Sequence, residues 1–100
     1  MSRRPNTNQN GGNWTETQKK EIWDRGKTVY GLSPDVWRDD KCGKRIKWTE
    51  HGNTSSTYGW EIDHINPVSN GGSDYPSNLQ PLHWRNNRDK GDKLYWKCPG

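Results

Sequence analysis

The chain has 100 residues, a formal net charge of +4 and only 25% hydrophobic residues. This length predicts one domain. The core must depend on the seven Trp and four Tyr residues, because each buried aromatic ring removes roughly 150–250 Å² from water. No apolar run reaches the length of a membrane span or a signal-peptide core, so we expect a cytoplasmic protein.

The first thirteen residues are rich in Asn and Gly and have no apolar residue after Met1. We expect them to form a disordered arm ahead of a single domain over residues 14–100. A helix is predicted from Thr15 to about Arg25, because Thr15 and Gln18 match a capping box.

Two shorter elements are predicted in the middle of the chain. Ser33 and Pro34 indicate a turn, or a single helical turn, that continues through Asp39. The sequence RIKWT at 45–49 predicts a strand. A polar loop follows, and we expect His51 within it to be solvated.

The second half has the order strand, loop, strand and helix. Alternating apolar residues predict a strand over 58–62, and the sequence SNGGSDYPSN predicts a loop over 69–78. A very short strand at 79–80 and a helix from position 81 or 82 to about Lys90 follow. The expected fold class is α+β, with a hairpin, a long connecting loop and a helix, and with one additional helix near the N-terminus.

A group of polar residues with fixed spacing lies in this second half. An Asp-His pair at 63–64 is followed by Asn78, fourteen positions after the His, and by Asn87, nine positions further. Hydrolysis of a phosphodiester needs a base that takes a proton from water, and imidazole suits this role because its ordinary pKa is near neutrality. Carboxylate and carboxamide oxygens suit a hard cation such as Mg²⁺ or Mn²⁺.

This arrangement resembles the HNH nuclease family over residues 37–92. The resemblance implies the ββα-metal fold and metal-dependent hydrolysis of DNA by an endonuclease. It implies that His64 is the general base that activates water. It also implies that Asp63 and Asn87 hold one divalent cation, Mg²⁺ or Mn²⁺. Asn78 would hold the long loop and keep the base oriented.

Basic residues close to this motif suit a phosphodiester substrate, because neutralisation of phosphates dominates affinity for nucleic acid. Asn87 and Lys90 are three positions apart and share one face of the predicted helix. We therefore expect Lys90 to lie beside the cation and contact phosphate. Arg88 and Lys93 are the other candidates for binding DNA.

The positions of the Asp-His pair raise a geometric difficulty. Adjacent residues in a regular strand point to opposite faces, so Asp63 and His64 can share one site only if the strand ends or twists there. The Asn66–Pro67 sequence that follows makes such an exit plausible. Glu61 is expected to face away from the site and to form a surface ion pair.

Members of the HNH family often carry two CxxC pairs around the hairpin, and the matching positions here hold Cys42, Arg45, His83 and Asn86. One thiol and one imidazole are too few for a tetrahedral structural zinc site, so we expect no structural zinc. A disulfide between Cys42 and Cys98 stays open, but two unpaired thiols are the favoured expectation.

Two other functions fit the same residues. One is a catalytically silent nucleic-acid-binding module with this fold, although such a module has no need for Asp63, His64 and Asn87 together. The other is a toxin-type nuclease domain, which uses the same chemistry in another setting. No sequence or structure preference for the DNA is predicted.

Overall fold

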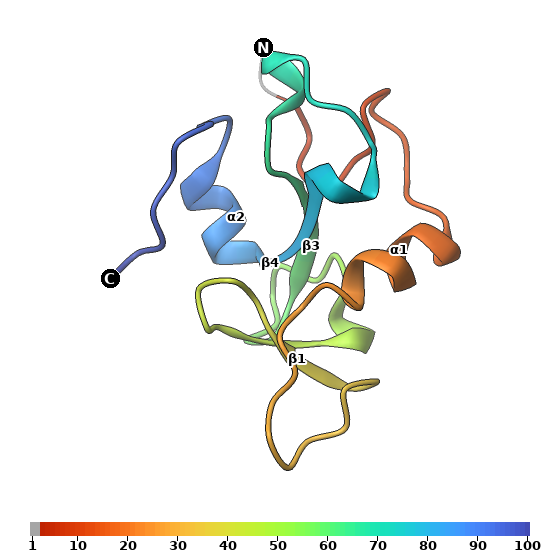
Figure 1. Cartoon of the computed structure of the whole chain (residues 1–100), viewed down its shortest axis with the longest axis vertical. Coiled ribbons are helices and arrows are strands. Elements are labelled where there is room, and N and C mark those ends of the chain that lie inside the picture. Colours follow the sequence, from red (N-terminus) through yellow and green to blue (C-terminus); the bar gives the residue numbers. More distant parts are fainter. Residues whose placement is uncertain (1–2) are drawn as a thin grey trace.

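The computed structural model describes residues 3–100, and in that part of the chain it has two α-helices and two antiparallel hairpins (Figure 1). The elements are α1 (Glu16–Trp23), β1 (Trp37–Asp39), β2 (Arg45–Lys47), β3 (Trp60–His64), β4 (Leu79–His83) and α2 (Trp84–Lys90). Single turns of 3-10 helix cover Trp48–Glu50, Val68–Asn70 and Pro76–Asn78. The predicted α+β fold, with a hairpin–loop–helix core and an additional N-terminal helix, is confirmed.

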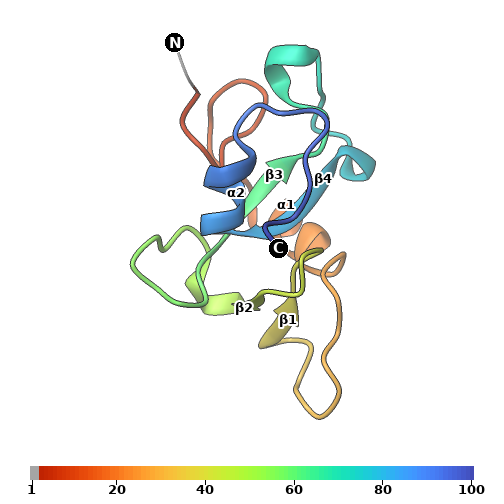
Figure 2. The same ribbon diagram turned by 90° about the vertical axis from the view of Figure 1, so that its left-hand side faces the viewer.

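The β3–β4 hairpin forms the centre of the molecule, with α1 and α2 on opposite sides of it (Figures 1 and 2). The smaller β1–β2 hairpin lies below it in both views. The long segment between β3 and β4 leaves and returns at the same end of the central hairpin. No helix within residues 3–100 has the length and apolar character that crossing a membrane requires.

The hydrophobic core lies between α1 and the central hairpin. Three tryptophans, Trp23, Trp48 and Trp60, contact one another with ring centroids 5.1–5.9 Å apart. The fully buried apolar side chains of this cluster are Ile22, Trp23, Ile46, Trp60, Ile62 and Leu79. Two tryptophans and four branched aliphatic side chains thus share the core, with Trp14 and Trp48 packed against it.

Helix α1 begins as the sequence predicts. The Thr15 hydroxyl accepts a hydrogen bond from the Gln18 amide, and the Gln18 side chain accepts one from the Thr15 amide, so the capping box is complete. The helix ends at Trp23, about two residues before the predicted boundary. Ile22 and Trp23, in the last turn of the helix, are buried in the core.

Three predicted elements differ from the observed ones. The turn that starts at Ser33 ends at Val36, and residues 37–39 form strand β1 instead of a helical turn. Strand β3 covers 60–64 rather than 58–62. The predicted strand at 45–49 ends at Lys47, where a 3-10 turn begins.

Strand β4 is longer than predicted because Pro81 lies inside it, and α2 begins only at Trp84. Pro81 pairs with Ile62, and the hydrogen-bonded positions of the ladder lie on either side of this pair. The missing N–H of proline therefore costs no ladder bond. The Ile62 amide points outward as well, and it donates to the side chain of Asn6 at 2.8 Å.

The predicted disordered arm over 1–13 has defined contacts where the structure describes it; residues 1 and 2 lie outside the described part. Asn6 Oδ1 accepts hydrogen bonds from the Ile62 amide and from His51 Nε2, at 2.8 and 3.1 Å. The segment therefore covers the free edge of β3. The prediction that His51 is solvated is wrong, because its ring also packs against Trp60 at 4.7 Å between centroids.

Cys42 and Cys98 form a disulfide, so the expectation of two unpaired thiols is wrong. Close to it, the fully buried Asp40 accepts four hydrogen bonds at 2.9 Å. Two come from the Cys42 and Lys44 amides, and two from the His83 amide and the Asn86 side chain. One carboxylate thus joins the β1–β2 turn to the start of α2.

Candidate active site

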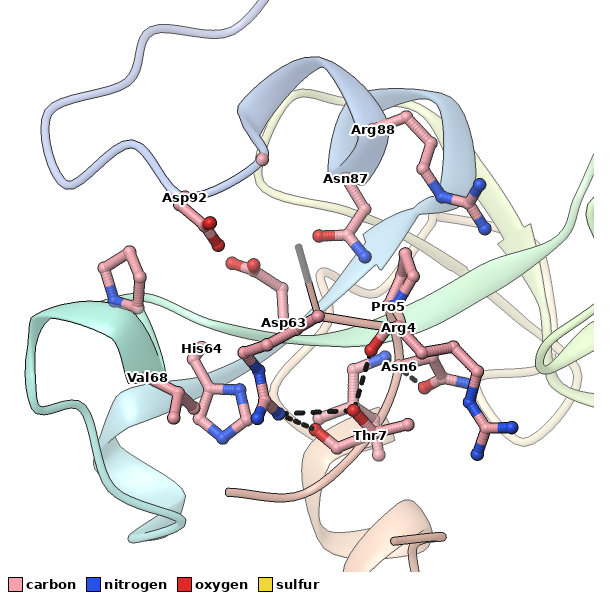
Figure 3. A pocket seen from close by; sticks show the side chains of 14 residues that line it. Arg4, Pro5, Asn6, Thr7, Asp63, His64, Val68, Asn87, Arg88 and Asp92 are labelled. Carbon is pink, nitrogen blue, oxygen red and sulfur yellow. Dashed lines mark hydrogen bonds between the residues drawn. The ribbon is translucent and has the colours of Figure 1, made fainter. Parts of the chain in front are cut away.

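A pocket of about 310 Å³ opens at the end of β3. It lies between the N-terminal segment, the first residues of the long loop, and the last turn of α2 (Figure 3). The polar and charged side chains that line it are Arg3, Arg4, Asn6, Thr7, Asp63, His64, Asn87, Arg88 and Asp92. The three residues that the motif singles out at 63, 64 and 87 are therefore brought together.

Asp63 lies on the face of β3 that packs against α2. Its carboxylate accepts a hydrogen bond from Gln80, directly opposite on β4, at 2.9 Å, and it lies 3.3 Å from the Lys90 ammonium. Burial raises the pKa of Asp63 above its ordinary value, while the bonds from Gln80 and Lys90 oppose that rise. The carboxylate is nearly buried, and only the pocket side is open for a further ligand.

The side chain of Asn87 is held by Glu61, which was expected to face away from the site. Glu61 Oε1 accepts a hydrogen bond from Asn87 Nδ2 at 2.9 Å, and its other oxygen accepts one from Arg88 at 3.0 Å. Glu61 is 3% exposed, so the expectation that it faces away in a surface pair is wrong. Because Nδ2 is engaged, the Asn87 carboxamide oxygen points to the opposite side, toward the part of the pocket that contains Asp63 and Asp92 (Figure 3).

His64 points away from Asp63, as adjacent strand residues should. Figure 3 shows the two side chains pointing in different directions. The His64 ring packs against Trp14 with 5.7 Å between centroids, and its Nε2 lies 2.7 Å from Asp74 Oδ1. Both side chains nonetheless line one pocket, because β3 ends at His64 and the pocket surrounds that end. The end of the strand therefore allows two side chains from opposite faces to line one pocket.

Asn78 lies outside the pocket and binds only backbone. Its carboxamide oxygen accepts from the Asn66 amide at 2.8 Å, and its nitrogen donates to the carbonyls of Asn66 and Ser73 at 3.1 and 2.8 Å. These bonds join the two ends of the loop after β3. The loop residues next to His64 are thus held by the half-buried carboxamide of Asn78.

The predicted phosphate-binding residues have different surroundings. Lys90 is 3% exposed, donates to the His64 carbonyl at 2.9 Å and faces Asp63, so its ammonium is already paired. Arg88 lines the pocket, but two of its nitrogens face Glu61. Lys93 is exposed, and its ammonium donates to the Asp89 carbonyl rather than facing the pocket.

The donors in the pocket fit a hard divalent cation. Asp63 supplies a carboxylate, Asn87 supplies a carboxamide oxygen fixed by Glu61, and the Asp92 carboxylate lies nearby (Figure 3). Oxygen donors in small number are typical of Mg²⁺ sites, in which water and substrate phosphates complete the shell. Within residues 3–100, no group of three or more His, Cys, Asp or Glu side chains is placed so that it could hold a metal ion by itself.

Several residues of the site have weak or absent signals in the sequence. Glu61 could have been found, because it precedes Asp63 by two positions and therefore shares its face of the strand. The contact between Gln80 and Asp63 can be predicted only when the register of the β3–β4 hairpin is known. Asp74 and Asn6 lie in segments that read as loop and arm, and only the folded chain places them beside His64 and β3.

Comparison with known proteins gives one match. The family model described as HNH endonuclease matches residues 40–93, which is more than half of the chain. Neither curated proteins nor solved structures gave a significant match.

Proposed function

This chain belongs to the HNH endonuclease family, and we propose that it is a metal-dependent endonuclease that hydrolyses the phosphodiester bonds of DNA. One observation carries this proposal: Asp63, His64 and Asn87 line the same pocket, although they come from two elements and from both faces of β3. A binding module needs no such convergence of a base and two oxygen donors.

In the proposed reaction His64 takes a proton from the attacking water. The water oxygen forms a bond to phosphorus as the bond to the 3′ oxygen breaks, leaving a 5′-phosphate and a 3′-hydroxyl. A divalent cation bound by Asp63 and Asn87 would supply positive charge to the phosphate and to the leaving oxygen. Glu61 would keep the Asn87 oxygen turned toward that cation.

The surface of the pocket supports a nucleic-acid substrate. Arg3, Arg4 and Arg88 all line it, and guanidinium groups suit phosphate because they offer several donors in one plane. The chain also carries a net charge of +4. A domain of this size has little surface for reading bases, so we expect modest sequence preference.

Cleavage of supercoiled plasmid tests this function. The wild-type chain should nick or linearise plasmid in Mg²⁺ or Mn²⁺ and not in excess chelator. His64→Ala should lower the rate by about 10²–10⁴-fold, because it removes the general base. Tyr30→Ala is the control, since Tyr30 is fully exposed and does not line the pocket.

Thermal unfolding of both variants must accompany the assay, to show that each is folded. Binding of plasmid without cleavage in either metal would contradict the proposal and would indicate the silent module. Equal cleavage by wild type and His64→Ala would indicate a contaminating nuclease or another base.

A further inference from the structure

Asp74 takes no direct part in the proposed hydrolysis, yet its carboxylate forms a short hydrogen bond to the His64 ring. The distance from His64 Nε2 to Asp74 Oδ1 is 2.7 Å. Within residues 3–100, no hydrogen bond engages the other ring nitrogen, Nδ1. We propose that Asp74 is a positioning residue that fixes the orientation and tautomer of His64, so that Nδ1 is the atom that accepts the proton. This inference rests on the proposed nuclease function.

The tautomer follows from the chemistry of the two groups. A carboxylate only accepts hydrogen bonds, so the ring nitrogen that faces it must carry the hydrogen. In a neutral imidazole the other nitrogen then has the free lone pair. With Nε2–H bound to Asp74, Nδ1 is the only nitrogen of His64 that can take a proton from water.

The same contact stabilises the product of that proton transfer. When Nδ1 accepts the proton, the ring becomes an imidazolium that carries a hydrogen on each nitrogen. The Asp74 carboxylate is then the partner of a cation, and such charge-assisted hydrogen bonds are roughly twice as strong as neutral ones. The leaving 3′ oxygen takes a proton from solvent, and the imidazolium of His64 releases its proton to solvent, so the base is restored and the charges balance over one cycle.

Asp74 is itself held in place from two directions. The Gln9 amide donates to both carboxylate oxygens, at 3.0 and 3.1 Å, and the Gln9 side chain accepts from the Asp74 amide at 3.0 Å. On the other side, Asn78 binds the Ser73 carbonyl. A carboxylate with these anchors is preorganised, whereas a free loop residue would have to be ordered at each turnover.

The opposite side of the His64 ring is also fixed, because Trp14 packs against it. Gln9 and Trp14 both precede helix α1 and are far from the motif in the sequence. The segment before α1 is therefore part of the machinery that positions the base.

The alternative is a purely structural role, in which the contact between Asp74 and His64 only holds the loop in place. In that case Asp74→Asn should weaken the fold or the loop, and it should not change which nitrogen of His64 is protonated. An asparagine can still accept from the Gln9 amide, but it can also present its NH₂ to His64 Nε2. That donor would force the hydrogen of the ring onto Nδ1, where it would block the base.

The experiment compares wild type, Asp74→Asn and the control Asp35→Asn, all as full-length chains. Asp35 is a largely exposed carboxylate outside the pocket lining. Long-range proton–nitrogen NMR spectra report the tautomer of the His64 ring without metal or DNA. We expect Nε2–H in wild type and in Asp35→Asn, and Nδ1–H in Asp74→Asn.

Plasmid cleavage and thermal unfolding are measured on the same samples. Asp74→Asn should lower kcat by about 10²-fold or more, as expected for a base in the wrong tautomer. KM and the metal concentration for half-maximal rate should change by less than about twofold, because Asp63 and Asn87 are untouched. Asp74→Glu should recover part of kcat, since it restores a carboxylate.

The inference is overturned if wild-type His64 is the Nδ1–H tautomer, or if Asp74→Asn keeps the wild-type tautomer and rate. If the wild-type chain cleaves no DNA, the proposed function fails, and the NMR spectra then decide the pairing alone. An Nε2–H ring that changes to Nδ1–H in Asp74→Asn would still support the positioning role, and any other pair of spectra would overturn it.

Discussion

The two faces of β3 bury different kinds of side chain. On one face Trp60 and Ile62 are at most 1% exposed and pack against α1 and its tryptophan neighbours. On the other face Glu61 and Asp63 are nearly as buried, but they face the amide and charged groups of α2. The five residues of β3 thus contribute both to the hydrophobic core and to the candidate site.

Burial stabilises the fold on one face of β3 and disfavours a charged group on the other. Burying Trp60 stabilises the fold through its apolar area. Burying Asp63 disfavours its charged form, which is why its pKa is raised. The polar face is tolerated because Gln80 and Lys90 pair with the Asp63 carboxylate, and Asn87 and Arg88 pair with that of Glu61.

The largest expected effect is on the apolar face. Trp60→Ala should lower the free energy of unfolding by about 3–5 kcal/mol, because it leaves a cavity where three rings meet. Chemical denaturation followed by circular dichroism measures this. Tyr95→Ala, on an exposed ring, should change stability by less than about 0.5 kcal/mol. Equal effects of both variants would show that the core is elsewhere.

The polar face should respond differently to one substitution and to two. Asp63→Ala should cost about 3 kcal/mol or more, because it leaves the Lys90 ammonium buried beside no anion. The double variant Asp63→Leu with Lys90→Met should recover most of that stability while plasmid cleavage stays abolished. A double variant no more stable than the single one would mean that the ion pair itself stabilises the fold.

Glu61 offers a subtler change on the same face. Glu61→Gln is nearly isosteric, but its NH₂ can bind the Asn87 oxygen and turn that oxygen away from the pocket. We expect the Mg²⁺ concentration for half-maximal cleavage to rise by about 10–100-fold, as for other residues that orient metal ligands. The exposed Glu21→Gln is the matched control. An unchanged Mg²⁺ requirement would show that Asn87 needs no help from Glu61.

The smallest expected effect is the pH dependence of the free energy of unfolding that His51 causes. His51 packs against Trp60 at the edge of the apolar face. Burial, with help from Lys19, lowers the pKa of His51 to about 4. The unfolded chain takes up this proton near pH 6.5. Stability from this residue is therefore complete above pH 6.5 and falls as the pH drops from 6.5 to 4.

We expect this loss to be about 1–2 kcal/mol, after allowing for the partial exposure of the ring. His51→Gln should flatten the dependence of unfolding free energy on pH across that window. Burial lowers the pKa of His83 too, so some slope of the same sign should persist. A slope identical to wild type would contradict the assignment to His51.

The sequence correctly predicted the features that depend on residues close together in the chain. Thr15 and Gln18 cap α1 through bonds that span three residues, and the alternation of Trp60 and Ile62 marks the core face of β3. The spacing from Asp63 to Asn87 identified the family, which the match over 40–93 confirms.

The missed features depend on contacts between distant segments. Gln9 and Asp74 are 65 positions apart, and neither sequence neighbourhood indicates a partner. The Asn6 side chain serves the edge of β3 in the same way. Pro81 read as a helix start, because only the register of the hairpin reveals that its nitrogen lies where no ladder bond is made.

That register has a further consequence for folding. If β4 slipped by one residue, Pro81 would occupy a position that must donate across the ladder, and a bond would be lost. The same slip would move every side chain of β4 to the opposite surface of the hairpin, separating Gln80 from Asp63 and sending it toward the tryptophans. A single imino acid thus disfavours the misfolded pairing, in which the polar surface around Asp63 and the aromatic interior would be exchanged.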